Sequence, residues 1–239
     1  MKLDDVKKLH QKKYRESFGY FLVEGEHLVL ELQKAALRDP RLRVSQLYVT
    51  HEHERWRSPF NTLVIKSREM AQISETKTPQ GIAAVVPLLQ AGAPGAGERS
   101  IFLHEVQDPG NLGTILRTLA WFGKFRCLLS PGSVDPYNSK AVRASMGAIF
   151  HVTVETGVQM NSLRQRFDRI ACLDTRGETL KSRTFKESGC YVFGNEARGL
   201  PGEQLAALGA QSFTIPGCGA IESLNLASTV NMCLYEINR

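Results

Sequence analysis

Hydrophobic and polar positions along the second half of the chain form a regular series of blocks. Apolar runs of strand length occur at residues 100–104, 125–129, 170–173, 191–193 and 212–215. Helical spacing of apolar residues occurs at 112–122, 138–144, 160–167, 202–208 and 224–237. Strands separated by helices of this length predict an α/β fold whose mostly parallel sheet has helices on both faces.

The first 90 residues mix the same two periods in a less regular order. Strand-like runs at 21–23, 44–50, 62–65 and 81–88 accompany a helical stretch at 26–37. Residues 91–97 (AGAPGAG) have almost no side chains that could anchor them, so we expect a flexible linker there. The sequence therefore predicts a small α/β domain at 1–90, a linker at 91–98 and a larger domain at 99–239.

Composition narrows the class of protein. Of the 239 residues, 42% are hydrophobic and 23% charged, which is ordinary for a soluble globular protein. No apolar run approaches the roughly 20 residues of a membrane span, and the first residues lack a signal-peptide core, so we expect a cytoplasmic protein. The five cysteines are scattered without a Cys-x-x-Cys pair, which argues against a disulfide framework or a zinc site and predicts small buried residues.

Basic residues gather at the start of a chain whose net charge is +6. Two acidic residues, Asp4 and Asp5, stand among the basic residues of the first 15 positions, which are Lys2, Lys7, Lys8, Lys12, Lys13 and Arg15. Such a segment can neutralise the phosphates of a nucleic acid, or it can be the solvated face of a helix. Charge alone leaves both interpretations open.

Three segments that follow predicted strands combine glycine with polar side chains. Ligands of parallel sheets bind beyond the carboxyl ends of the strands, so these loops are candidate sites. Residues 104–113 contain Asn111 and lead into a helix that carries Arg117 opposite its apolar stripe. Residues 193–201 place Glu196 between two glycines, and residues 215–225 place Ser223 and Asn225 before the last helix. Taken singly, each segment is also compatible with a helix cap or a surface charge.

In this order and spacing, the three segments resemble the motifs of the SpoU (TrmH-like) RNA ribose methyltransferases. The matching stretches are 108–118 (DPGNLGTILRT), 194–200 (GNEARGL) and 215–225 (IPGCGAIESLN), with further likeness at 135–138 (DPYN) and 143–147 (RASMG). The first part resembles the substrate-binding domain that often precedes this catalytic domain, through residues 21–25 (FLVEG) and 78–82 (TPQGI).

The resemblance implies a fold, a cofactor and a reaction. The C-terminal domain would be a SPOUT-type sheet whose last segment is threaded into a deep trefoil knot, and the N-terminal domain would have a ribosomal protein L30e-like fold. A homodimer would transfer a methyl group from S-adenosylmethionine to a ribose 2′-hydroxyl. The separate N-terminal domain favours 23S ribosomal RNA as substrate; transfer RNA, or a non-catalytic RNA-binding homologue, are the alternatives.

The resemblance also assigns roles to residues. Arg117 corresponds to the catalytic arginine of the family, and because an arginine side chain is a poor general base we expect Arg117 to bind the phosphate beside the target ribose. The remaining polar motif positions, which would position Arg117, the ribose and the cofactor, are Asn111, Glu196, Ser223 and Asn225. The cofactor would be bound at Gly194, Ile215 and Leu224. The expected RNA contacts are Lys7, Lys8, Lys12, Lys13, Arg15 and Arg143.

Two positions depart from the family pattern. Gly217 stands where the family commonly has a larger apolar residue, often Met, which would loosen the cofactor loop. Arg198 gives the second segment a bulkier and charged end. Neither departure removes a catalytic group, so the sequence predicts an active enzyme.

Overall fold

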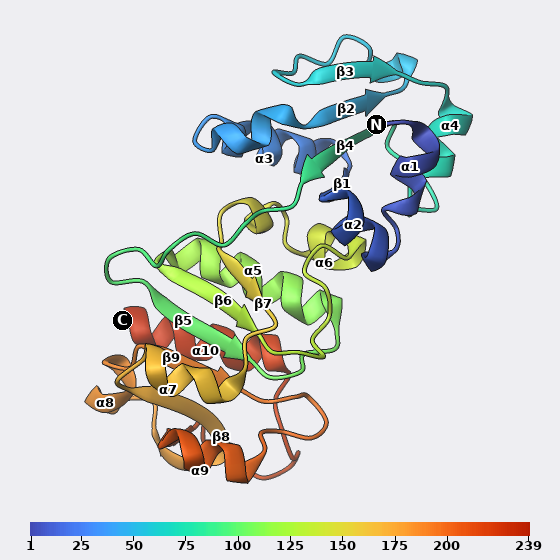
Figure 1. Cartoon of the computed structure of the whole chain (residues 1–239). Helices are drawn as coiled ribbons and strands as arrows, with labels where there is room; N and C mark the ends of the chain where they lie inside the picture. Colours follow the sequence, from blue (N-terminus) through green and yellow to red (C-terminus); the bar gives the residue numbers. More distant parts are fainter. The chain divides into compact units, whose positions relative to one another are not determined.

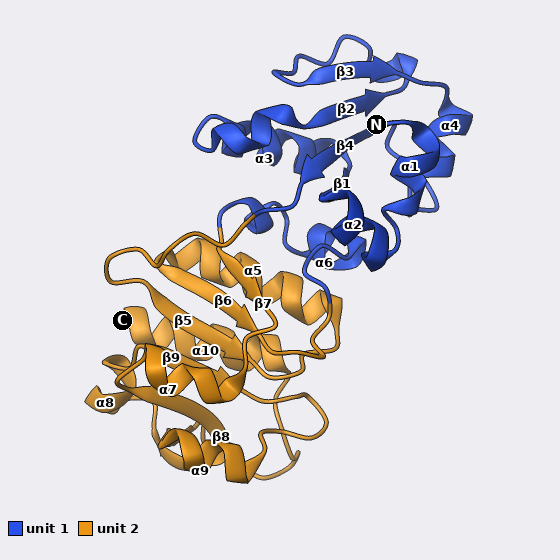
Figure 2. Cartoon of the chain, viewed as in Figure 1, with its two compact units in different colours: residues 1–89, 135–151 blue, residues 90–134, 152–239 orange.

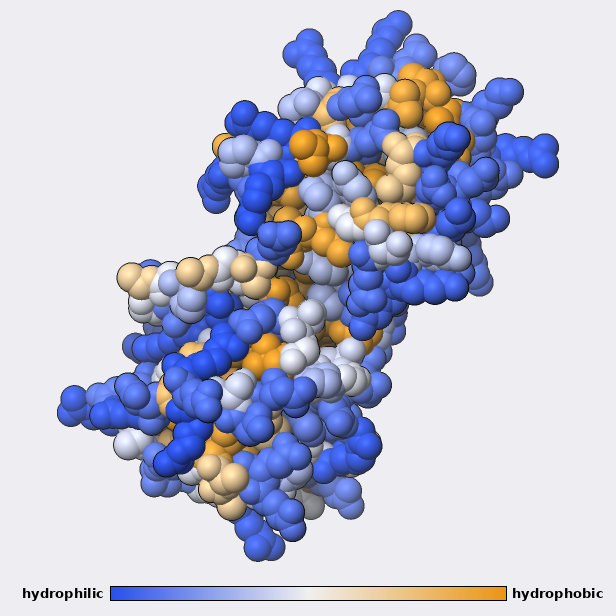
Figure 3. Space-filling model, viewed as in Figure 1, coloured by the Kyte–Doolittle hydropathy of each residue, from blue (hydrophilic) through white to orange (hydrophobic).

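A computed structural model describes residues 1–239, which divide into two compact units (Figure 1 and Figure 2). Unit 1 consists of residues 1–89 and 135–151, and unit 2 of residues 90–134 and 152–239. The face of the chain drawn in Figure 3 is mainly hydrophilic, with smaller apolar patches on each unit. None of the helices combines the length and the apolar character that a bilayer crossing requires.

Unit 1 is built on a four-stranded sheet in the order β1-β4-β2-β3. β4 pairs antiparallel with β1 and with β2, whereas β2 and β3 are parallel. Along the chain, residues 1–89 form α1 (Leu3–Lys8), α2 (Lys12–Phe18), β1 (Tyr20–Glu24), α3 (Glu26–Ala36), η1 (Pro40–Val44), β2 (Gln46–Val49), η2 (His51–His53), β3 (Asn61–Val64), α4 (Ser67–Ile73) and β4 (Ile82–Pro87).

Different elements pack on the two faces of the sheet of unit 1. Val6 of α1 and Met70 of α4 pack with Tyr48 of β2 in one buried cluster. On the α3 side, Phe21 of β1 contacts two rings from residues 135–151, with centroid distances of 4.7 Å to Tyr137 and 6.4 Å to Phe150. This later segment, which forms α6 (Ser139–Ala144) and η3 (Ala148–Phe150), is therefore part of the core of unit 1.

A buried ion pair reinforces the attachment of that segment. Arg15 is 4% exposed, and its Nε and Nη2 donate to Asp135 Oδ2 at 2.9 and 2.5 Å, while Nη1 donates to the carbonyl of Leu9 at 2.7 Å. A buried charge needs such a partner because the desolvation of an unpaired guanidinium is costly. The sequence prediction that Arg15 contacts RNA is accordingly withdrawn, since its N–H groups are committed within the fold.

Unit 2 is a six-stranded sheet in the order β10-β8-β9-β5-β6-β7 in which every pairing is parallel. This confirms the predicted mostly parallel sheet. Along the chain the unit contains β5 (Arg99–Leu103), α5 (Pro109–Phe122), β6 (Phe125–Leu129), β7 (Val154–Thr156), η4 (Met160–Ser162), α7 (Leu163–Arg166), β8 (Ile170–Thr179), α8 (Arg183–Lys186), β9 (Cys190–Phe193), α9 (Gly202–Leu208), β10 (Gln211–Thr214) and α10 (Leu226–Asn238).

Helices cover both faces of this second sheet, as the pattern predicts. Phe102 and Val192 point into a cluster with Leu163 of α7 and Leu208 of α9. On the other face, α5 packs against α10, and Phe185 of α8 meets the ring of Tyr191 edge-on. α5, which follows the first strand of this sheet in sequence, and α10, which follows the last, are thus neighbours on one face (Figure 1). The trefoil knot and the L30e-like assignment stay predictions.

The glycine-rich segment at 91–97 and the residue after it make hydrogen bonds to unit 2. Arg126 of β6, which is 3% exposed, donates from Nη2 to the carbonyl of Gly92 at 3.1 Å. Glu98 accepts from Arg126 Nε at 3.1 Å and from the Gly95 N–H at 3.0 Å. These bonds attach the segment to the sheet of unit 2 through Arg126. The linker at 91–98 stays a prediction.

The cysteines behave as the composition predicts, with one exception. Cys127, Cys172, Cys190 and Cys233 are buried, whereas Cys218 is exposed in the segment after β10. Burial raises the pKa of Cys127 to about 12, so this thiol stays neutral at physiological pH. The buried cysteines are therefore packing residues.

Candidate active site

Three loops converge at the carboxyl end of the sheet of unit 2. They follow β5, β9 and β10, and β9 lies between β5 and β8 in the sheet. Parallel strands end at the same edge, so loops that are far apart in the sequence become neighbours there. The three predicted motif segments are these loops.

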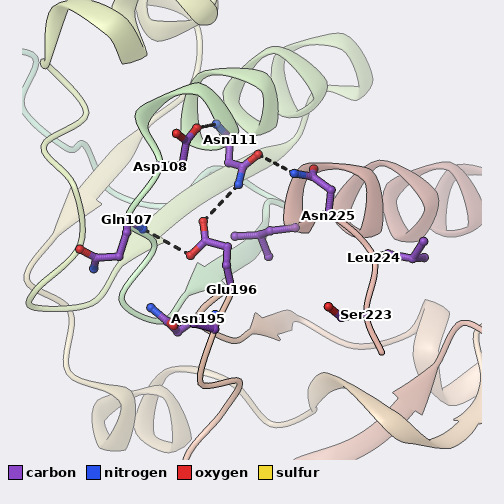
Figure 4. A pocket seen from close by; sticks show the side chains of 10 residues that line it. Gln107, Asp108, Asn111, Asn195, Glu196, Ser223, Leu224 and Asn225 are labelled. Carbon is purple, nitrogen blue, oxygen red and sulfur yellow. Dashed lines mark hydrogen bonds between the residues drawn. The ribbon is translucent and has the colours of Figure 1, made fainter. Parts of the chain in front are cut away.

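A chain of hydrogen bonds joins the three loops (Figure 4). Asn111 Nδ2 donates to Glu196 Oε1 at 3.2 Å, and Asn225 Nδ2 donates to Asn111 Oδ1 at 2.9 Å. The second oxygen of Glu196 accepts from the Gln107 N–H at 3.4 Å. Asn111 thus uses its amide as a donor toward one loop and as an acceptor toward the other, a pairing that an aspartate or leucine of similar size could not provide.

Two of these loops end in helix caps. Asp108 Oδ1 accepts from the Asn111 N–H at 2.7 Å, which starts α5 at Pro109. Asn225 Oδ1 accepts from the Ser228 N–H at 3.2 Å, which starts α10. Asp108 is therefore the cap of α5, which leaves the Asn111 side chain for the network. Two helix N-termini, each with a partial positive charge, therefore face Glu196.

The turn at Glu105 fixes the loop after β9. Glu105 has a φ of +48°, which is uncommon for a residue with a side chain. Its carbonyl accepts from Asn195 Nδ2 and from Gln107 Nε2, both at 2.8 Å. Its carboxylate pairs with Arg198, the residue that departs from the family pattern. Arg198, the charged end of the second segment, therefore forms an ion pair with Glu105 of the first.

These side chains surround a cavity of about 440 Å³. The volume lies in the range of small-molecule sites. The cavity brings together five of the predicted site residues, namely Asn111, Glu196, Ser223, Leu224 and Asn225. The structure adds lining residues that the sequence prediction missed, which are Gln107, Asp108, Asn195, Ala197 and Leu226. All five are within or beside the motif segments. Their position in the sequence could therefore have indicated them, whereas the chemistry of their side chains could not.

Three of the residues predicted to be catalytic or to bind the cofactor do not line the cavity. Arg117 lies on the exposed side of α5 and makes no hydrogen bond or ion pair within the chain. Ile215 begins the third loop and is partly buried. Gly194 has a structural reason to be glycine, because a Cβ there would lie 2.5 Å from the carbonyl carbon of Gly199. Gly199 closes the loop by exchanging two main-chain hydrogen bonds with Asn195.

Family comparison decides what this arrangement is. Residues 98–235 match the SpoU rRNA Methylase family, and residues 2–84 match the MRM3-like substrate binding domain. The chain belongs to the SpoU rRNA methylase family. The family match contains all three loops around the cavity, so the resemblance drawn from the motifs is confirmed.

Some relatives of this SpoU methylase match nearly the whole chain. The chain is 32% identical to the 23S rRNA (guanosine(2553)-2′-O)-methyltransferase RlmP of Bacillus subtilis, over 99% of this chain and 95% of the relative. It is 30% identical to mouse mitochondrial rRNA methyltransferase 3, over 95% of this chain and 69% of that protein. A crystal structure of an AdoMet-bound rRNA methyltransferase from Sinorhizobium meliloti is 26% identical and superposes with a TM-score of 0.83, covering 98% of this chain and 93% of that one.

Substitution of Gly194 tests the geometry of the second loop. We expect Gly194→Ala to lower the melting temperature by about 2–10 °C, because the added methyl group collides with the main chain of Gly199. The matched control is Gly217→Ala, whose Cβ meets nothing within 4 Å and which should shift the melting temperature by less than about 2 °C. Differential scanning calorimetry measures both. Equal melting temperatures would show that the loop is not closed as described.

Proposed function

We propose that this SpoU methylase transfers a methyl group from S-adenosylmethionine to a ribose 2′-hydroxyl of large-subunit ribosomal RNA. The observation that carries the proposal is the meeting of Asn111, Glu196 and Asn225 at one cavity, in a chain that matches the family over residues 98–235. The full-length relative that bears a 23S rRNA 2′-O-methyltransferase name supports the substrate and the target atom.

The residues around the cavity fit S-adenosylmethionine. Glu196 brings a carboxylate, and its negative charge suits a ligand with a net positive charge from its sulfonium and ammonium groups. Asn111 and Asn225 supply amide groups, Leu224 supplies an apolar side chain, and the volume of about 440 Å³ accommodates a nucleoside with its side arm. We propose that Gly194, Ile215 and Leu224 contribute main-chain groups to the cofactor. When bound, the cofactor supplies an electrophilic methyl group.

Arg117 is the residue we assign to the substrate. The guanidinium of an arginine is a poor proton acceptor because it stays protonated in proteins, but it can bind a phosphate with two hydrogen bonds. Because Arg117 is exposed and has no partner in the chain, it is free to bind the phosphate next to the target ribose. This would hold the 2′-hydroxyl in line with the methyl group, and alignment of this kind lowers the barrier strongly. Asn111, Glu196, Ser223 and Asn225 position the ribose and the cofactor.

Arg117→Ala tests this assignment. We expect methyl transfer to ribosomal RNA to fall at least about 100-fold, because the ribose is no longer aligned, while the affinity for S-adenosylmethionine stays within about twofold. Turnover is measured with labelled cofactor and affinity by calorimetry. The matched control is Arg183→Ala, which removes an arginine whose side chain is 90% exposed on α8. Wild-type turnover of Arg117→Ala would refute the role.

We also propose that the chain functions as a homodimer through α5 and α10. These helices pack together and expose large apolar side chains on Trp121 (85%), Tyr235 (62%) and Met232 (45%). Exposed apolar side chains grouped in this way mark protein interfaces. Arg117 lies four residues before Trp121, hence on the same side of α5. A second copy that covers Trp121 would therefore place Arg117 beside the partner.

The oligomeric state of Trp121→Asp tests the dimer. We expect wild type to sediment as a dimer at micromolar concentration and Trp121→Asp as a monomer, because a carboxylate in the interface would lose its hydration. The matched control is Leu37→Asp, which alters a side chain that is 76% exposed in unit 1 and should leave the dimer intact. Analytical ultracentrifugation measures all three. A monomeric wild type, or an unchanged Trp121→Asp, contradicts the proposal.

The basic start of the chain is proposed to bind the RNA backbone. Lys7 and Lys13 are exposed, and Lys8 and Lys12 are exposed with surface ion pairs to Asp5 and Glu16, which cost little to break. Arg143 is a weaker candidate because it is partly buried, with Nη1 enclosed. The four lysines open the part of the chain that matches the substrate-binding domain.

Charge reversal of Lys7, Lys8, Lys12 and Lys13 to glutamate tests the phosphate contacts. We expect weaker RNA binding and a flatter dependence of affinity on salt, by about 0.7 in log–log slope for each lost contact with a single strand. Fluorescence anisotropy at several salt concentrations measures the slope. Reversal of two exposed lysines of unit 2, Lys124 and Lys181, is the control. An unchanged slope would return the four lysines to an ordinary solvated helix face.

A further inference from the structure

An aromatic ring lies among the lysines at the start of the chain. Tyr14 is on α2, directly after Lys12 and Lys13. Its side chain is partly exposed, and its hydroxyl group makes no hydrogen bond within the chain and is not enclosed by it. The fold therefore leaves both the hydroxyl and part of the ring accessible from solvent.

Packing within unit 1 does not account for this ring. Phe18, one helical turn later on α2, packs on the buried cluster of Val6, Tyr48 and Met70, whereas Tyr14 is not among the residues packed on that cluster. The ring centroids of Tyr14 and Phe18 are 5.7 Å apart, with an interplanar angle of 30°. This contact holds the Tyr14 ring in place from the side of the core, and the remainder of the ring is available for another contact.

Two lysine side chains lie against the remainder of the ring. The Nζ atoms of Lys13 and Lys8 are 4.7 and 6.0 Å from the ring centroid of Tyr14. Both lysines are exposed, and Lys8 also pairs with Asp5 at 2.9 Å. Exposed side chains change rotamer within nanoseconds. The ring is therefore covered on this side by cations that can move away, and no helix or strand has to shift to uncover it.

We propose that Tyr14 is a stacking surface for an unpaired RNA base, with Lys8 and Lys13 on the phosphates beside that base. The stacking of a base on an aromatic ring is stronger than an exposed cation–π contact, so a base displaces the ammonium groups. Each displaced ammonium group then binds a phosphate of the same strand. This inference rests on the proposed function, because it names the kind of RNA that the basic segment binds.

The stacking surface decides which RNA this segment prefers. Bases inside a duplex stack on their neighbours and offer no free face, whereas bases of loops and single strands can turn out onto a protein. Lysines alone do not make this distinction, because a duplex and a single strand both present phosphates. Tyr14 therefore gives the basic start of the chain a preference for unpaired nucleotides.

Two variants of the full-length protein, Tyr14→Leu and Tyr14→Phe, separate the ring from the charges. For a single-stranded RNA of roughly 12 nucleotides, we expect Tyr14→Leu to weaken binding about 5–50-fold and Tyr14→Phe to stay within about threefold of wild type, because only the first loses the ring. A duplex of the same length should bind all three proteins equally within about twofold. The slope of affinity against salt should not change, since no charge is lost. Fluorescence anisotropy measures each affinity.

The matched control is Phe167→Leu in unit 2. Phe167 is also a partly buried ring beside a cation, with Cζ of Arg166 5.7 Å from its centroid, and it lies outside the substrate-binding domain. We expect its affinity for both RNAs to equal that of wild type. The melting temperature of Tyr14→Leu should stay within about 3 °C of wild type, which separates a lost contact from a lost fold. Wild-type affinity of Tyr14→Leu for the single strand, or an equal loss on the duplex, would overturn the proposal.

A photochemical crosslink reports the contact directly. A single strand that carries 5-iodouridine would be irradiated on the protein, and the modified residue assigned by mass spectrometry. We expect the crosslink on Tyr14 and its loss in Tyr14→Leu; crosslinks on other residues alone would overturn the proposal. If wild type binds the single strand through Tyr14 but transfers no methyl group to any RNA, the proposed function fails and the stacking surface stands.

Discussion

The site depends on the side chain of Asn111. Its amide donates to Glu196 at 3.2 Å and accepts from Asn225 at 2.9 Å, so one residue joins loops that are 85 and 114 positions away in the sequence. The cavity exists because these loops are held around it. Each contact is partly exposed and modest in energy, but together they decide where the carboxylate of Glu196 lies.

The sheet makes this junction possible. β9 is inserted between β5 and β8, so the loops after β5 and β9 emerge side by side, and α10 returns to pack on α5. Both helices begin at the cavity, with Asp108 and Asn225 as their caps. Their N-termini carry partial positive charge, and Glu196, whose carboxylate suits the proposed cationic cofactor, lies at the same cavity.

Local pattern predicted much of this arrangement. β6 (Phe125–Leu129) and α9 (Gly202–Leu208) have the predicted bounds. Buried strands and amphipathic helices can be recognised by the spacing of their hydrophobic residues. β7 (Val154–Thr156) was missed, since three partly exposed residues have no readable period. The packing of Tyr137 and Phe150 against Phe21 in unit 1 could not be foreseen, because it joins segments more than a hundred residues apart.

The site residues also divide into those that local sequence predicts and those that depend on long-range contacts. The motifs predicted Asn111, Glu196 and Asn225, whose positions follow from loop order along a parallel sheet. The burial of Arg15 was not predictable, because its partner Asp135 is remote in sequence and an arginine among lysines looks like a surface charge. The buried polar atoms without hydrogen-bond partners, among them Thr50 Oγ1 and Trp56 Nε1, have no sequence motif, and only coordinates reveal them.

The chemical identity of the methylated nucleoside tests the central claim most directly. Purified protein and labelled S-adenosylmethionine would be incubated with protein-free ribosomal RNA and, in a separate reaction, with transfer RNA. Each RNA would then be digested to nucleosides for mass spectrometry. The account predicts label in a 2′-O-methylnucleoside from large-subunit ribosomal RNA. Label in a base-methylated nucleoside, in transfer RNA alone, or in no RNA would contradict it.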